Sequence, residues 1–65
     1  MRTNAQRIQS ARKALRPYKP ETESVETALI DLMADLYHLA DKEGISMDKV
    51  RRVAFMHFAA EQGKE

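Results

Sequence analysis

The sequence predicts an all-α protein, with a basic N-terminal helix, a proline-bounded linker and a helical hairpin that packs in a homodimer. Apolar residues recur at spacings of three and four along most of the chain, which is typical of helices. Only two glycines and two prolines interrupt this pattern. The 65 residues include no cysteine, so no disulfide can stabilise a chain that is too short to bury a large core. We therefore expect one helical domain over residues 1–65 that is completed by association.

The first helix is expected over Asn4–Leu15, within a basic segment that spans residues 1–16. Ile8, Ala11 and Leu15 form a narrow apolar stripe on this helix, and the basic residues gather on its other side.

A linker is expected at residues 17–23, because Pro17 should end the first helix. Proline disfavours the α conformation in the residue before it, and Pro20 repeats the signal. Tyr18 lies between the two prolines, where it could anchor an interface or pack over the hairpin.

The second helix should run from about Val25 to Lys42, with Thr22 or Ser24 as its N-cap. Five residues alternate spacings of four and three, as in the seam of a packed helix pair: Val25, Leu29, Leu32, Leu36 and Leu39. Neighbouring apolar residues widen this arc to about 200°, more than one partner helix would cover.

The third helix should be capped by Ser46 and reach about Gln62, with Gly44 ending the second helix. The link formed by residues 43–45 is short, so the second and third helices must be neighbours. They could be antiparallel or cross more steeply.

Residues 53–60 carry no charge and point all round the third helix. A helix that is apolar on every side must be covered on several sides, and a 65-residue chain has little material for this. We therefore expect an oligomer interface that contains Leu29, Leu32, Leu36, Val53, Phe55, Met56, Phe58 and Ala59.

Charge is divided sharply along the chain. Residues 1–20 carry six basic residues and no acid, whereas residues 21–65 carry ten acids and five basic residues. A basic segment of this kind can bind nucleic acid or an acidic protein, or it can fold back on its own acidic body or that of a sister subunit. The candidate contacts are Arg2, Arg7, Arg12, Lys13, Arg16, Lys49, Arg51 and Arg52.

Residues 36–53 resemble the helix-turn-helix unit of the lactose-repressor family. The matching positions are a small residue at Ala40, Gly44 and Ile45 at the turn, Ser46 as cap, and Val50 and Val53 on the second helix. The resemblance implies DNA binding, with Ser46, Met47, Lys49, Arg51 and Arg52 facing the groove or the phosphates.

A second resemblance covers residues 32–61. The pattern Asp-Leu-x2-His-x5-Gly-Ile-x-apolar-Asp, followed by Ala-x2-His-Phe-x2-Glu, is similar to short uncharacterised proteins of phages and bacterial genomes. These proteins commonly have a variable N-terminus and a C-terminal helical hairpin. The resemblance implies an accessory role in a phage or mobile element and assigns no activity.

Four potential metal ligands occur on the two long helices: Asp31, Asp35, His38 and His57. In an antiparallel hairpin the two histidines would lie about 8 Å apart along the axis, too far to share one ion. We therefore expect no metal, no cofactor and no enzymatic activity.

The favoured function is non-enzymatic regulation or inhibition, through the binding of a host or phage protein by a helical homo-oligomer. Helix-turn-helix DNA binding is the alternative, and an RNA-binding hairpin dimer is a further one. With no membrane span and no cysteine, we expect a cytoplasmic protein that does not contact membranes.

Overall fold

The computed structural model describes residues 2–21 and 24–63, which form three α-helices joined by short connections. α1 covers Asn4–Leu15, α2 covers Val25–Glu43 and α3 covers Met47–Gln62. A short 3₁₀ helix, η1, covers Arg16–Glu21. The prediction of an all-α fold is confirmed, and the helix ends agree with the predicted ones to within one residue. No helix in the described ranges is both long enough and apolar enough to cross a bilayer.

α1 begins with a reciprocal capping arrangement between Thr3 and Gln6. The Thr3 hydroxyl accepts a hydrogen bond from the Gln6 backbone N–H at 3.1 Å, and the Gln6 side-chain oxygen accepts one from the Thr3 N–H at 2.8 Å. Two N–H groups that the helix leaves without a partner are satisfied in this way. The capping box explains why α1 starts at Asn4.

Serine residues cap the other two helices. The hydroxyls of Ser24 and Ser46 each accept a hydrogen bond from the backbone N–H three residues later, at 3.1 and 3.3 Å. Both caps were predicted from the sequence and both are confirmed. Thr22, the alternative cap for α2, lies outside the described residues.

The chain does not become extended before Pro17, so the predicted reason for the end of α1 is wrong. Arg16 has φ −53° and ψ −43°, within the α region. Pro17 has no N–H to donate, and its fixed φ suits the first turn of a new helical segment. Part of the predicted linker is therefore the 3₁₀ helix η1.

The turn between α2 and α3 depends on Gly44, which has φ +69°. This left-handed conformation lets the Ile45 N–H bond the Ala40 carbonyl at 2.8 Å and the Gly44 N–H bond the Asp41 carbonyl at 3.3 Å. Both bonds satisfy carbonyls at the end of α2. The chain turns within the three residues between α2 and α3, residues 44–46.

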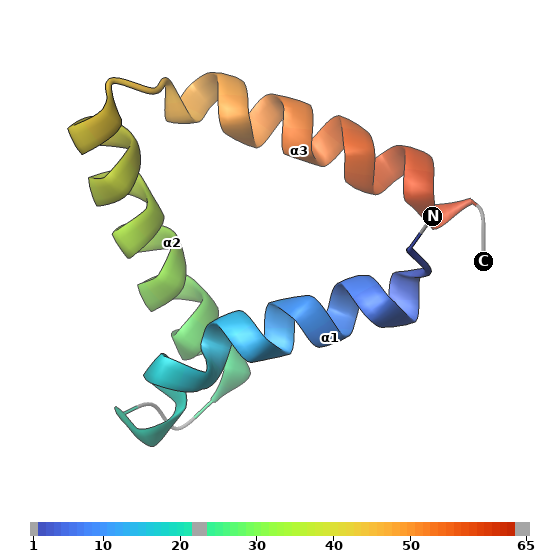
Figure 1. The fold of residues 1–65 in the computed structure, drawn as a ribbon, viewed down its shortest axis with the longest axis horizontal. Coiled ribbons are helices and arrows are strands. Elements are labelled where there is room, and N and C mark those ends of the chain that lie inside the picture. The colour runs from blue at the N-terminus through green and yellow to red at the C-terminus, as the bar shows by residue number, and fades with distance from the viewer. Residues whose placement is uncertain (1, 22–23, 64–65) are drawn as a thin grey trace.

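The three α-helices form the sides of a flat, open triangle with extents of 33 × 30 × 17 Å (Figure 1). α1 and α2 contact each other and η1 at one corner. α2 and α3 diverge from the Gly44 turn, so the steeper of the two predicted arrangements is the observed one. At the third corner, the end of α3 lies beside the start of α1.

The core of this triangle is small. The buried apolar residues of the described chain are Leu15, Ala28 and Ala40. The radius of gyration is 13.3 Å, compared with about 10.7 Å for a compact domain of this length. The single chain thus forms its helices without packing them into a globular interior.

Candidate interaction surface

The predicted seam of α2 has almost no cover within the chain. Leu32 is half-buried, but the other four seam residues are exposed, from 38% for Leu36 to 57% for Leu39. α2 packs instead through its flank, where Ala28 is fully buried and Asp35 receives a hydrogen bond from η1. Within the described residues, most of the face with the spacing of a packed helix pair is therefore exposed.

α3 exposes its largest apolar residues. Phe55 is 66% exposed and Met56 is 59% exposed, and Phe58 is also exposed. The rings of Phe55 and Phe58 lie with their centroids 5.9 Å apart and tilted by 45°, which is an ordinary attractive aromatic geometry. Of the other two predicted interface residues on this helix, Val53 is half-buried and Ala59 is exposed.

Further exposed apolar residues were not among the predicted interface residues. They are Ile8, Val25, Ile30, Met33, Tyr37, Leu39, Ile45 and Val50. Ile30 and Tyr37 belong to the wide apolar arc of α2, so the width of the arc was the signal that could have identified them. We call all the exposed large apolar side chains of the molecule, together with Leu32, Val53 and Ala59, the apolar surface.

A hollow of about 330 Å³ opens between the start of α1 and the end of α3. Its apolar lining is Ile8, Ala11 and Phe58. Both Ile8 and Phe58 are exposed, so the hollow is an open part of the apolar surface.

Polar contacts close this corner of the triangle. The Arg7 Nε lies 3.3 Å from Glu61 Oε2, and Arg7 Nη1 donates to Asn4 Oδ1 at 2.8 Å. The Asn4 side-chain nitrogen, Nδ2, in turn donates to the Glu61 backbone carbonyl at 3.1 Å. Arg7 was predicted as a contact for nucleic acid or an acidic partner, and its side chain instead holds α1 to α3.

The remaining predicted basic contacts lie at two places. Arg51 pairs with Asp48 one turn earlier on α3, and the hydrogen bond from this pair, with the charges of Tyr37 and Asp48, raises the Arg51 pKa. Lys49 and Arg52 are exposed on the same helix. The others, all exposed, lie along α1 and its two ends: Arg2, Arg12, Lys13 and Arg16.

The histidines and aspartates form no metal centre in the part of the chain that is described. No group of three or more His, Cys, Asp or Glu side chains in residues 2–21 and 24–63 is close enough to hold an ion. Asp35 accepts a hydrogen bond from Tyr18. The spacing of residues along the sequence did not predict this hydrogen bond between η1 and α2.

No protein-family model, curated protein or solved structure matches this chain. The surface of the described residues has two dominant chemical properties: exposed apolar area on α2 and α3, and exposed basic side chains on α1.

Proposed function

We propose that this chain is a small non-enzymatic regulatory or inhibitory protein that acts by binding proteins, and that its working form is a helical homo-oligomer. The main support for this proposal is the large exposed area of the apolar surface. In the described part of the chain, thirteen large apolar side chains are between 38% and 66% exposed, while the buried apolar residues are two alanines and one leucine. Soluble proteins rarely leave so much apolar area uncovered unless it binds something.

The exposed area is large enough for a stable interface. The chain exposes 5621 Å², whereas a compact protein of 7.5 kDa exposes about 4,200 Å². The excess is about 1,400 Å², and each partner in a standard interface contributes only about 800 Å². Burial on this scale belongs to obligate assemblies, whose interfaces resemble a domain core divided between subunits.

A second copy is the occupant that fits the α2 seam. Seam residues with alternating spacings of four and three can interdigitate with the same seam of a symmetry-related helix. In a twofold dimer, one surface patch covers its own copy, so a single sequence supplies both halves of the interface. The acidic side chains of Asp31, Asp35 and Asp41 are off the seam and do not block this pairing.

A regulatory or inhibitory role needs apolar surface that remains after self-association. The apolar arc of α2 is about 200° wide, and the exposed residues of α3 surround its axis, so one dimer contact leaves part of the surface open. From the predicted resemblance of residues 32–61 to short phage and bacterial proteins, we also propose an accessory role of this kind.

Capture from a lysate of the source cells, with and without nuclease, tests the proposal. The wild-type chain should retain a protein after nuclease treatment, and Phe55→Ala with Met56→Ala should lose that protein. The control pair Lys49→Ala and Arg52→Ala, also on exposed positions of α3, should retain it. If nuclease releases everything that is captured, the partner is nucleic acid and the proposal is wrong.

Helix-turn-helix DNA binding is the second candidate, because α2 and α3 diverge steeply from a glycine turn (Figure 1). Two observations place it second. Ile45 at the turn and Val50 on the second helix of the resembling unit are exposed, so neither is packed into a compact interior. Arg51 is bound to Asp48 on its own helix.

A further inference from the structure

One face of α1 carries concentrated positive charge. Arg12 and Arg16 are four residues apart, as are Gln9 and Lys13. With 3.6 residues per turn, these four side chains fall within about 100° of arc around the helix. The apolar stripe of Ile8, Ala11 and Leu15 occupies a different side of the helix.

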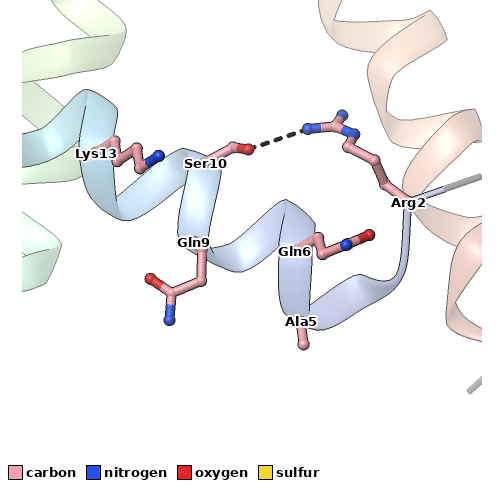
Figure 2. Close-up of a pocket in the computed structure, with 6 residues that line it drawn as sticks. All are labelled: Arg2, Ala5, Gln6, Gln9, Ser10 and Lys13. Carbon is pink, nitrogen blue, oxygen red and sulfur yellow. Dashed lines mark hydrogen bonds between the residues drawn. The ribbon is translucent and has the colours of Figure 1, made fainter.

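Arg2 extends this face past the start of the helix. Its guanidinium folds back along α1 and donates to the Ser10 hydroxyl at 3.1 Å (Figure 2). Arg2 and Lys13 thus border one shallow hollow, which Ala5, Gln6, Gln9 and Ser10 also line. We call Arg2, Arg12, Lys13 and Arg16 the basic face.

The acidic body of the chain does not neutralise the basic face. Among the described residues, none provides a carboxylate partner for Arg12, Lys13 or Arg16, and Arg2 contacts a neutral hydroxyl. Of the basic residues on α1, Arg7 is the one that folds back on the body, through Glu61. Arg7 therefore has a structural role in joining α1 to α3. The four side chains of the basic face have no such ion pair among the described residues.

We propose that the basic face binds the phosphate backbone of a double-stranded nucleic acid without reading its sequence. Three of the four cations are arginines, whose forked guanidinium can donate two hydrogen bonds to one phosphate. The interleaved side chains Gln6, Gln9 and Ser10 can donate to phosphate oxygens as well.

The composition of the face distinguishes this partner from two others. An acidic protein interface needs an apolar core, and the hollow contributes only Ala5 for that purpose. Single strands are held by bases stacked on aromatic rings, and no aromatic residue lies between Arg2 and Arg16. A duplex backbone needs neither feature.

The dimensions and charge also suit a duplex. The 12 residues of α1 extend over about 18 Å, and B-DNA carries one charge per about 1.7 Å of axis. With four phosphate contacts per chain, the logarithm of the binding constant should fall with the logarithm of the salt concentration with a slope of about −3.6. Affinity should therefore fall about 100-fold between roughly 50 and 200 mM salt.

Fluorescence anisotropy with full-length protein and a labelled duplex of arbitrary sequence tests the proposal, with circular dichroism to verify helicity. Arg12→Gln with Lys13→Gln should weaken binding roughly 60-fold near 0.1 M salt and reduce the slope by about 1.8. Arg16→Gln alone should reduce it by about 0.9. Glutamine preserves helix propensity, so these changes act on charge.

The matched control is Lys49→Gln with Arg52→Gln, which removes the same charge from exposed positions on α3. It should leave affinity within about threefold, because those charges are not part of the contact. Equal loss in both double variants, or greater loss in the control, would overturn the proposal. Tighter binding of a single strand, or equal competition by polyglutamate, would overturn it too.

Discussion

The Tyr18 hydroxyl donates a hydrogen bond to Asp35 Oδ2 across 2.5 Å, and this bond ties η1 to the middle of α2. Tyr18 therefore contacts the second helix of its own chain. The hydrogen bond to Asp35 raises the pKa of Tyr18, with smaller effects from desolvation and from the charges of Asp35 and Asp31. A raised pKa means that the folded state holds the phenolic proton more tightly than the unfolded state does.

Tyr18 should make stability fall at alkaline pH. Its contribution is complete below the unfolded pKa of 10.0 and is lost as pH rises through the higher folded value, because the phenolate cannot donate to Asp35. Tyr18→Phe should be less stable than the wild type near pH 8, and this difference should shrink near about pH 11. Urea denaturation at both pH values measures it.

Tyr37→Phe is the matched control, because Tyr37 is an exposed tyrosine on α2. This variant should keep the same alkaline loss of stability as the wild type. A constant difference between wild type and Tyr18→Phe across the pH range would show that the hydrogen bond does not form in solution.

Gly44→Ala should destabilise the chain by about 1–2 kcal/mol, because a Cβ disfavours the left-handed conformation. The loss should come from the backbone φ of +69° and not from a steric clash, because a Cβ at Gly44 would meet no atom within 4 Å. Gly63→Ala is the control, with open space and an ordinary φ of −82°. Thermal denaturation should show a loss for the first variant and little change for the second. Equal losses of stability in the two variants would show that the left-handed conformation of Gly44 does not make glycine necessary at the turn.

Leu36→Asp should weaken self-association more than 100-fold, because a carboxylate buried without a partner costs several kcal/mol. Leu36 is the fourth of the five α2 seam residues and is 38% exposed in the single chain. The matched control is His38→Asp, two residues away and off the seam. Analytical ultracentrifugation of both variants decides whether the seam is the contact: if His38→Asp dissociates the oligomer equally, the interface lies elsewhere.

The local structure of this protein was largely predictable from its sequence. Ser24, Gly44 and Ser46 act through bonds to backbone groups a few residues away, so their residue types were sufficient to place the ends of α2 and α3. The end of α1 was placed correctly for an incorrect reason. Pro17 was compatible with either an extended residue before it or a new helical turn, and the structure has the turn.

The contacts between helices were not predictable. The pairs Tyr18–Asp35 and Arg7–Glu61 depend on how the helices are arranged in space, and nothing in the spacing along the chain encodes them. The three-residue link after α2 permitted both an antiparallel and a steep arrangement. Because the apolar arcs are wider than one neighbour can cover, periodicity alone could not specify which surface each helix would bury.

The sequence predicted that α2 and α3 carry surplus apolar surface, but it did not identify all the residues of that surface. The uncharged run at residues 53–60 predicted an oligomer interface on α3; its aromatic residues are exposed in the single chain, and the interface stays a prediction. Arg7 was grouped with the other basic residues because its contact with Glu61 joins opposite ends of the chain. Ile8 was assigned to a narrow apolar stripe on α1, and in the structure it is exposed and lines an open hollow.

If a second copy covers the α2 seam, the protein should be at least a dimer, and sedimentation equilibrium of the full chain at micromolar concentration measures this. We expect a mass of at least twice the 7.5 kDa of one chain, with a melting temperature that rises with protein concentration, as expected when folding is coupled to assembly. A folded species of 7.5 kDa with a melting temperature independent of concentration would contradict it.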